Sequence, residues 1–268
     1  MRSEVVLSAR MGALTRMVSK GNRVCDVGCD HGWISIYLVQ QGISPYVLAM
    51  DVRQGPLSRA QEHIRQQGLE AYIETRLSDG VTALEIGEAD TMICAGMGGR
   101  LMQRILEEGR EKLTAMRELI LQPQSEIAAF RVYLRRAGYV TVTEDMVYED
   151  GKYYPMMKVT PGERMAGGEV FAGHRENRGE NIFRRQERTE ILEDVDRQKL
   201  EDCFGRMLLT SRHPVLKQYL LAAGENNRQI LEQLEQHATA GSRTAGRIGE
   251  LREEQRLISL ALVRYFSF

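Results

Sequence analysis

The sequence predicts a doubly wound α/β domain followed by a smaller helical domain. Short apolar segments alternate with helical segments over roughly the first 160 residues. A glycine-containing turn within residues 24–32 joins the first apolar segment to the helix that follows it. The strand pattern stops near residue 163 and is replaced by heptad-like repeats. Alternating strands and helices are typical of a parallel sheet that helices cover on both faces.

Length and charge limit the domain organisation and the kinds of partner that this chain can have. The 268 residues fit a domain over 1–162 and a helical domain over 163–268. The 36 basic and 37 acidic side chains nearly balance, so any contact with nucleic acid must use a local basic patch. The N-terminus lacks the pattern of a signal peptide and no apolar run reaches membrane-span length, so we expect a cytoplasmic protein with no membrane contact.

The four cysteines lack the spacing of a metal site. They have no second pair or histidine cluster beside them, which predicts reduced, buried thiols and no bound metal. These residues are Cys25, Cys29, Cys94 and Cys203.

Local patterns predict the elements of the first domain in order. Apolar residues at helical spacing precede the first strand, and Pro56 suits the first turn of a later helix. The predicted parallel strands are 23–27, 46–50, 72–77, 91–94 and 119–121, and the predicted helices are 4–19, 33–40, 56–67, 101–109 and 125–137.

An antiparallel hairpin is predicted after these elements. Strand-like runs over 139–148 and 152–160 are joined by Glu149, Asp150 and Gly151. Parallel strands closed by an antiparallel hairpin form the sheet of class I methyltransferases, which is Rossmann-like. Domains that bind nicotinamide cofactors usually end in a further parallel strand.

The second domain is predicted to be helical. A polar, arginine-rich helix covers 175–202, and two heptad seams over 216–237 and 248–265 flank a small-residue turn at 240–242. This pattern indicates an antiparallel coiled coil, in which Asn227, His237 and Gln255 would set the register. His213 and His237 are interpreted as seam or surface residues rather than ligands.

The first glycine turn departs from a dinucleotide-binding fingerprint. Its glycines are Gly28 and Gly32, and Asp30 stands where a middle glycine would approach a pyrophosphate. A carboxylate repels phosphate, but together with Asp26 it would offset an ammonium or sulfonium charge. The turn therefore favours S-adenosylmethionine over NAD.

Further acids are predicted to lie at strand ends. Asp51 would accept both ribose hydroxyls, and Asp79 would accept from the adenine amine while Gly80 lets the ring approach. Each residue alone could equally be a solvated carboxylate or a helix cap. His31 is interpreted as a hydrogen-bonding residue of the cofactor site rather than a general base. Trp33 and Tyr37 are interpreted as packing residues.

The segment Ala95–Gly99 is the second distinctive turn. It lacks the Asn/Asp-Pro-Pro-aromatic motif with which many methyltransferases activate an exocyclic amine. A flexible, mostly apolar corner suits a nucleophile that already has a free lone pair, such as adenine N1, which needs positioning more than deprotonation. The alternative is a glycine turn that only lets a strand and a helix pack.

Five motifs resemble the TrmK family, the bacterial tRNA (adenine-22-N1)-methyltransferases, and the resemblance covers essentially the whole chain. The motifs are Leu7-Ser8-x-Arg10, Asp26-Val27-Gly28-x-Asp30-His31, Asp79-Gly80, Ala95-Gly96-Met97-Gly98-Gly99 and Leu121-Gln122-Pro123. The resemblance implies an enzyme whose first domain binds S-adenosyl-L-methionine and whose helical domain helps to hold tRNA. Relatives often carry a glutamate where this chain has Asp51, and either carboxylate would hold a ribose.

The residues and the resemblance together predict three sets of site residues. The cofactor set is Leu7, Arg10, Asp26, Gly28, Asp30, His31, Gly32, Asp51, Ser78, Asp79, Gly80, Ala95, Gly96 and Met97. The catalytic set is Asp30, Met97, Gly98 and Gln122. The substrate set is Gly99, Pro123, Arg175, Arg178, Arg184, Arg185 and Arg188. The arginines would contact phosphates, and the alternative is a solvated helix face with interleaved glutamates.

Alternative functions stay open at this point. The chain could be a class I methyltransferase of another RNA, a protein or a small molecule, or a non-catalytic scaffold that binds the cofactor. A nicotinamide-dependent reductase is a third alternative. We expect a monomer, while self-association through the coiled coil remains an alternative.

Overall fold

The structure is a computed structural model that describes residues 4–162, 183–236 and 242–267; within the helices, the side chains of 183–193 and 242–244 are not described. The chain divides into two compact units, residues 1–163 and 164–268. Each unit is described by itself.

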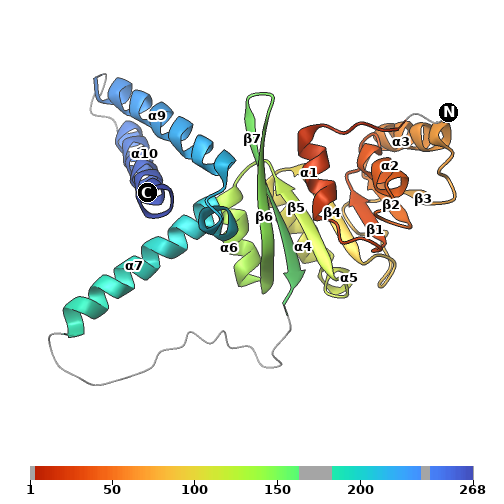
Figure 1. Cartoon of the computed structure of the whole chain (residues 1–268), viewed down its shortest axis with the longest axis horizontal. Helices are drawn as coiled ribbons and strands as arrows, with labels where there is room; N and C mark the ends of the chain where they lie inside the picture. The colour runs from red at the N-terminus through yellow and green to blue at the C-terminus, as the bar shows by residue number, and fades with distance from the viewer. Residues whose placement is uncertain (1–3, 163–182, 237–241, 268) are drawn as a thin grey trace. The chain divides into compact units, whose positions relative to one another are not determined.

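The first unit contains a seven-stranded sheet in the order β3-β2-β1-β4-β5-β7-β6 (Figure 1). The five strands β1 to β5 pair in parallel, and β7 runs antiparallel to both β5 and β6. The predicted class I methyltransferase sheet with an antiparallel hairpin at its edge is therefore confirmed. The strands are β1 Val24–Val27, β2 Val47–Asp51, β3 Ile73–Leu77, β4 Thr91–Met97, β5 Glu118–Pro123, β6 Tyr139–Glu149 and β7 Lys152–Pro161.

Helices cover both faces of this sheet. One buried cluster joins α1, α2 and α3 to one face, and a second joins α4, α5 and α6 to the other face. The helices are α1 Ala9–Met17, α2 Trp33–Gln40, α3 Gln54–Gln67, α4 Gly99–Glu108, α5 Arg110–Leu113 and α6 Ile127–Arg136.

The strands are buried on both faces because successive side chains point to opposite sides of the sheet. In β2, Val47 and Ala49 belong to the cluster under α1 to α3, whereas Leu48 and Met50 belong to the cluster under α4 to α6. The same alternation puts Asp26 of β1 on the α2 side. The continuous apolar runs of the sequence follow from this burial.

Strand β4 is longer than the sequence predicts. Ala95 pairs with Gln122 and Met97 pairs with Pro123, with a register shift between Ala95 and Met97. Gly96 lies at this irregularity with a φ of 78°, a left-handed conformation that glycine adopts without a steric penalty. Part of the predicted glycine corner is therefore a bulged strand end.

The second unit is helical in the part that the structure describes. The long helices α9 and α10 contact each other, and Leu216, Leu220, Leu251 and Ile258 are buried. A π-helical turn, Leu262–Phe266, ends the second predicted seam, while His237 and the predicted turn at 240–241 lie outside the described residues. The α-helices of this unit are α7 Phe183–Phe204, α8 Arg206–Thr210, α9 Pro214–Gln236 and α10 Ser242–Ala261.

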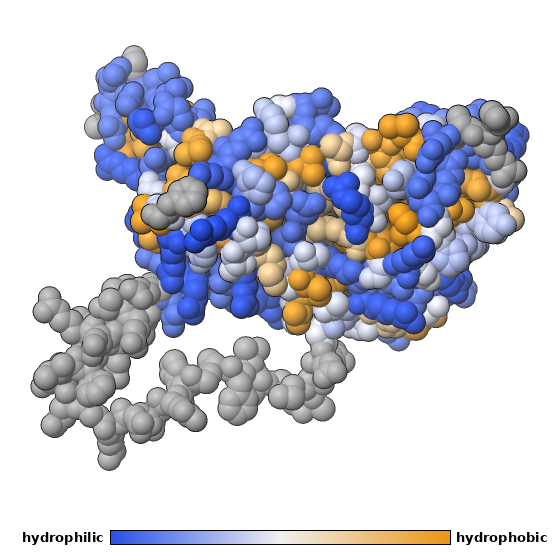
Figure 2. All heavy atoms as spheres, in the orientation of Figure 1, coloured by the Kyte–Doolittle hydropathy of each residue, from blue (hydrophilic) through white to orange (hydrophobic). Residues whose placement is uncertain are grey.

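The surface in Figure 2 shows hydrophobic residues in separate patches among hydrophilic ones. This is the ordinary composition of a protein surface, since apolar atoms contribute a large share of it. Among the described residues, no helix has the length and apolar character needed to cross a membrane.

Candidate functional site

A cavity of about 570 Å³ lies at the carboxyl ends of β1, β2, β3 and β4. Open α/β sheets bind ligands at this edge, and the volume lies within the range of small-molecule sites. All residues that line the cavity belong to the first unit. The lining contains Arg10, Met11, Leu14, Asp26, Val27, Gly28, Cys29, Asp30, His31, Trp33, Ile34, Asp51, Val52, Arg53, Ser78, Asp79, Gly80, Ala95, Gly96, Met97, Leu101, Arg104, Ile105 and Gln124.

The first glycine turn forms the floor of the cavity. The amides of Gly28 and Cys29 both donate to the carbonyl of Met50, at 2.8 and 2.9 Å, which ties the turn to the end of β2. Asp30 has a φ of 48°, so it adopts the left-handed conformation that a middle glycine would otherwise supply. Gly32 packs closely on Ala60. A Cβ added to Gly32 would lie only 3.1 Å from the Ala60 side chain.

Asp51 is held by two backbone amides at the end of β2. Its side chain is buried, and its two oxygens accept from the amides of Asp30 at 3.3 Å and Arg53 at 2.9 Å. These bonds fix the carboxylate at the end of β2 while leaving lone pairs on both oxygens. Asp51 is therefore oriented to accept hydroxyl donors.

Asp26 differs from the other acids because it lies inside β1. It is buried and accepts a 2.7 Å hydrogen bond from the hydroxyl of Ser35 on α2. Burial, opposed by the Ser35 hydrogen bond and reinforced by the nearby Asp51, raises the pKa of Asp26 to about 6. A cation in the cavity would favour its ionised form.

The loop Ser78–Gly80 closes the side of the cavity after β3. The Ser78 hydroxyl donates to the carbonyl of Gly80 at 2.9 Å and accepts from the amide of Ala83 at 3.1 Å. The carboxylate of Asp79 accepts two hydrogen bonds from Arg104 of α4, at 2.8 and 3.1 Å. This pair lowers the pKa of Asp79, and Arg104 is a cavity residue that sequence reasoning missed.

Met97 lies directly over the first glycine turn. A Cβ on Gly28 would meet the terminal methyl of Met97, which would have to move aside, and the φ of 77° at Gly28 favours glycine. The Met97 sulfur also lies 3.7 Å from the Cys94 thiol. The β4 end and the β1 turn therefore meet inside the cavity.

Four residues predicted from the glycine corner and the Gln-Pro motif do not line the cavity, namely Gly98, Gly99, Gln122 and Pro123. Gln122 is buried in β5, where its amide nitrogen donates to the carbonyl of Pro123 at 3.1 Å. Gly99 packs against the backbone of Ser125, since an added Cβ would lie 2.7 Å from that carbonyl. Gly98 only begins α4, so this part of the corner serves the packing of strand and helix.

Gln122 instead holds Arg10, which does line the cavity. Its amide oxygen accepts from the Arg10 guanidinium at 3.1 Å. Glu149 lies 3.9 Å from the same guanidinium and accepts from the Arg10 amide at 3.2 Å, while the ring of Tyr154 lies 5.1 Å below. Residues of β5, β6 and β7 thus fix one cation beside Gly96.

A stack of aromatic rings borders the opposite side of the turn. The His63 ring stacks between His31 and Trp33, with centroid distances of 5.8 and 4.1 Å. His63 Nδ1 also lies 2.9 Å from the carbonyl of His31, and His31 Nε2 lies 3.6 Å from the Asp30 carboxylate. His31 is therefore held by its neighbours rather than placed against a hydroxyl or thiol.

Of the remaining predicted residues, the structure describes the side chain of Leu7 only. Leu7 is partly buried ahead of α1 and is not part of the lining. Arg175 and Arg178 lie outside the described residues. Arg184, Arg185 and Arg188 belong to α7, in the part whose side chains are not described.

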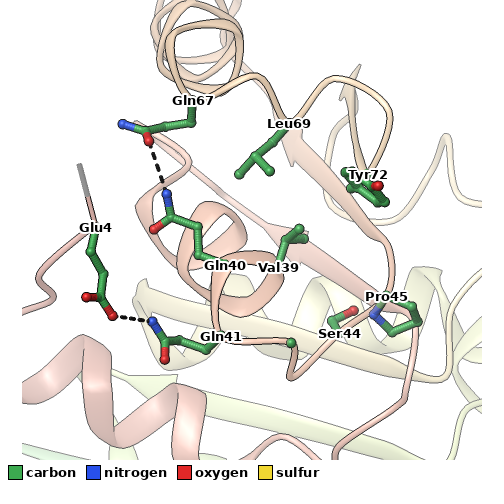
Figure 3. Close-up of a pocket in the computed structure, with 10 residues that line it drawn as sticks. Glu4, Val39, Gln40, Gln41, Ser44, Pro45, Gln67, Leu69 and Tyr72 are labelled. Atoms are coloured by element: carbon green, nitrogen blue, oxygen red, sulfur yellow. Dashed lines mark hydrogen bonds between the residues drawn. The ribbon is translucent and has the colours of Figure 1, made fainter. Parts of the chain in front are cut away.

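A second cavity of about 580 Å³ lies at the other end of the strands (Figure 3). Gln40 at the end of α2 and Gln41 directly after it form hydrogen bonds with Gln67 and Glu4 at the cavity wall, at 3.1 and 2.7 Å. Its residues precede β2 and β3, so it lies at the edge where open α/β sheets do not bind their ligands. Within the described ranges, no cluster of His, Cys, Asp and Glu could hold a metal ion.

Comparisons with known proteins agree on the kind of domain. A family model described as a methyltransferase domain matches residues 7–157. The tRNA (adenine(22)-N(1))-methyltransferase of Bacillus subtilis is 34% identical over 164 residues, which cover 61% of this chain and 69% of that protein.

Two solved structures match nearly the whole chain. The m1A22 tRNA methyltransferase TrmK of Bacillus subtilis is 25% identical with a TM-score of 0.75, covering 97% of this chain and 100% of that one. A Streptococcus pneumoniae protein in complex with S-adenosyl-L-methionine is 28% identical with a TM-score of 0.74, covering 96% and 100%.

Proposed function

The chain belongs to the methyltransferase family of the Bacillus subtilis tRNA (adenine(22)-N(1))-methyltransferase, and on this premise we propose that its cavity carries out the same reaction. It is an S-adenosyl-L-methionine-dependent enzyme that methylates N1 of an adenine in tRNA. The observation that carries the proposal is the cavity at the carboxyl edge, where the oriented carboxylate of Asp51 faces the Gly28–Gly32 turn.

The residues present fit this cofactor. Asp51 has free lone pairs for the two ribose hydroxyls, and Gly28 and Gly32 keep the floor free of side chains. Asp26 and Asp30 supply negative charge for a ligand that carries ammonium and sulfonium groups. When bound, the cofactor supplies a methyl group on a cationic sulfur.

Apolar side chains form a slot for the adenine ring of the cofactor. Val52 and Leu101 are well exposed although both line the cavity, and Ile105, which also lines it, packs against Gly80. Contact with a ring on both faces would bury this apolar surface. Asp79, at the edge of the slot, accepts a hydrogen bond from the exocyclic amine of the adenine.

Arg10 holds the carboxylate of the methionine part. Its guanidinium lines the cavity and has donors beyond the one that Gln122 takes. A bidentate contact with a carboxylate suits this planar group. Gln122 and Glu149 are positioning residues that act through Arg10. This role of Gln122 replaces the direct contact with substrate that the sequence led us to expect.

The end of β4 accommodates the target adenine. Its N1 has a free lone pair, so the site must hold the base in line with the methyl group rather than remove a proton. Ala95, Gly96 and Met97 are the residues of the corner that line the cavity. Attack by N1 gives a cationic base, and the carboxylate of Asp30 stabilises this charge.

The tRNA must release the target base from its stack, at a cost of a few kcal/mol. We infer that the helical domain over 163–268 contributes to this binding through basic side chains. Arg175, Arg178, Arg184, Arg185 and Arg188 stay the proposed phosphate contacts. The enzyme is proposed to act in the cytoplasm as a monomer.

Nucleoside mass spectrometry tests the proposal. The enzyme is incubated with tRNA and methyl-labelled S-adenosylmethionine, and the digested tRNA should contain labelled 1-methyladenosine. The variant Asp30→Asn removes one charge, and asparagine tolerates the left-handed backbone of this position. Its turnover should fall about tenfold to hundredfold, whereas Glu70→Gln at an exposed site should have no effect. Labelled N6-methyladenosine, or no labelled nucleoside, would contradict the proposal.

A further inference from the structure

Arg104 is a cavity residue with no role in the function described so far. It lies on α4 and donates to both oxygens of Asp79, at 2.8 and 3.1 Å. Both side chains line the cavity, and they are 44% and 52% exposed. An exposed ion pair adds little to the stability of the fold. The Arg104–Asp79 pair therefore calls for an explanation in terms of the ligand that the cavity binds.

The loop that carries Asp79 is rigidly held. Its backbone is bonded internally by Ser78 and by Thr82, whose hydroxyl donates to the Asp79 carbonyl at 2.6 Å. Lys112 of α5 donates to the carbonyls of Val81 and Thr82, at 3.1 and 2.6 Å.

Helix α4 is pressed against the same loop. Gly80 has a φ of 56°, and a Cβ there would lie 2.9 Å from Ile105. Arg104 and Ile105 are neighbours on α4, so the contact that closes the loop onto the helix also brings the guanidinium to Asp79. The Asp79 side chain is partly exposed, and the two hydrogen bonds from Arg104 determine its direction.

We propose that Arg104 is a positioning residue that makes Asp79 select an amino group over a carbonyl at position 6 of the cofactor's purine. This inference rests on the proposed S-adenosylmethionine-dependent function. A carboxylate has about four lone-pair sites, and the bidentate arginine leaves one on each oxygen. The remaining sites accept a hydrogen bond from an amine. A carbonyl oxygen at the same place would face a fixed negative acceptor and be repelled.

The charge state of Asp79 agrees with this role. The Arg104 hydrogen bonds are the main cause that lowers the pKa of Asp79. An ionised Asp79 has no proton to donate, so it cannot adapt to a carbonyl. Without Arg104, an exposed carboxylate would turn toward water and lose this selectivity.

Calorimetric titration with two ligands tests the inference on the full chain. The ligands are S-adenosylhomocysteine, which has the 6-amino group, and S-inosylhomocysteine, which has a carbonyl there. The variant Arg104→Leu should weaken binding of the adenosyl ligand about tenfold, as expected for one hydrogen bond to a charged group. It should strengthen binding of the inosyl ligand, because the fixed acceptor that repels the carbonyl is lost. Arg104→Lys, whose ammonium is a point charge in place of a planar fork, should fall between.

Arg100→Leu is the matched control. Arg100 lies one turn earlier on α4, is 88% exposed, pairs with Glu126 and does not line the cavity. It should leave both affinities unchanged, and the melting temperatures of all variants should agree. An unchanged ratio of the two affinities in Arg104→Leu would overturn the inference while leaving the proposed function intact. Failure of the wild-type chain to bind S-adenosylhomocysteine would overturn both.

Discussion

At the scale of single residues, the proposed ribose contact depends on Asp51. Its carboxylate is held by two backbone amides before any ligand arrives, so little entropy is lost when hydroxyls bind. The variant Asp51→Asn keeps the shape but removes the charge and one acceptor. The Kd for S-adenosylmethionine should rise about tenfold or more, measured by calorimetry. Glu70→Gln, at an exposed position outside the cavity, should bind as the wild type does.

The raised pKa of Asp26 predicts that cofactor binding depends on pH. Because its pKa is raised to about 6 in the folded chain, the folded state binds this proton more readily than the unfolded state does. Asp26 therefore adds stability below its unfolded pKa of about 4, and this stability is lost as the pH rises through about 6. A cationic cofactor favours the ionised form, so its affinity should increase as the pH rises from 5 to 7.5.

Calorimetry across this pH range measures the effect. The variant Asp26→Asn should bind with an affinity that changes little between pH 5 and 7.5. The same pH dependence in the variant and in the wild type would show that another group is responsible. The melting temperature of the variant establishes that it is folded.

The strand-end acids could be predicted from sequence because the topology alone places them. Asp51 and Asp79 follow strands whose carboxyl ends must meet at one edge, and both line the cavity. Arg104 and Glu149 could not be predicted, since their contacts join segments 25 and 139 positions apart. Gln122 was expected at the substrate because the end of β5 was placed too early. The strand continues to Pro123, so Gln122 stays inside the sheet.

At the scale of elements, the start of α4 depends on Gly99. A Cβ there would lie 2.7 Å from the Ser125 backbone, which cannot move as a flexible side chain could. Gly99→Ala should therefore reduce the free energy of unfolding by roughly 1–3 kcal/mol in a denaturant titration. Gly55 of α3 has open space around its Cβ position, so Gly55→Ala should be neutral or stabilise by up to about 1 kcal/mol. Equal effects of the two changes would contradict the packing described at α4.

The helices and strands differ in how closely their observed bounds agree with those predicted from the sequence. Helix α2 has the predicted bounds, because a glycine precedes its apolar run and a polar segment follows it. Helix α1 begins five residues later than predicted, at Ala9, where the Ser8 hydroxyl accepts from the Met11 amide as an N-cap. Strand β4 runs three residues further, through a glycine bulge that composition alone marks as a turn. Short α5 and α8 carry too few residues for a periodic signal.

At the scale of the whole molecule, the described cavity belongs to the first unit alone. A chain that ends at residue 162 should therefore fold and bind S-adenosylmethionine with an affinity close to that of the full chain. Its KM for tRNA should rise, because the proposed phosphate contacts lie in the removed part. Circular dichroism, cofactor titration and tRNA kinetics measure the three properties. Loss of cofactor binding in a folded truncated chain would contradict the assignment of the site to one unit.

The position of the methyl group on the product tRNA decides whether this cavity methylates N1 of one adenine. Two transcripts of one tRNA, with adenine or guanine at position 22, are incubated with the full chain and labelled S-adenosylmethionine, then digested and analysed by mass spectrometry. We predict labelled 1-methyladenosine from the adenine transcript and none above background from the guanine transcript. Equal labelling of the two transcripts, or label on another nucleoside, would contradict the claim.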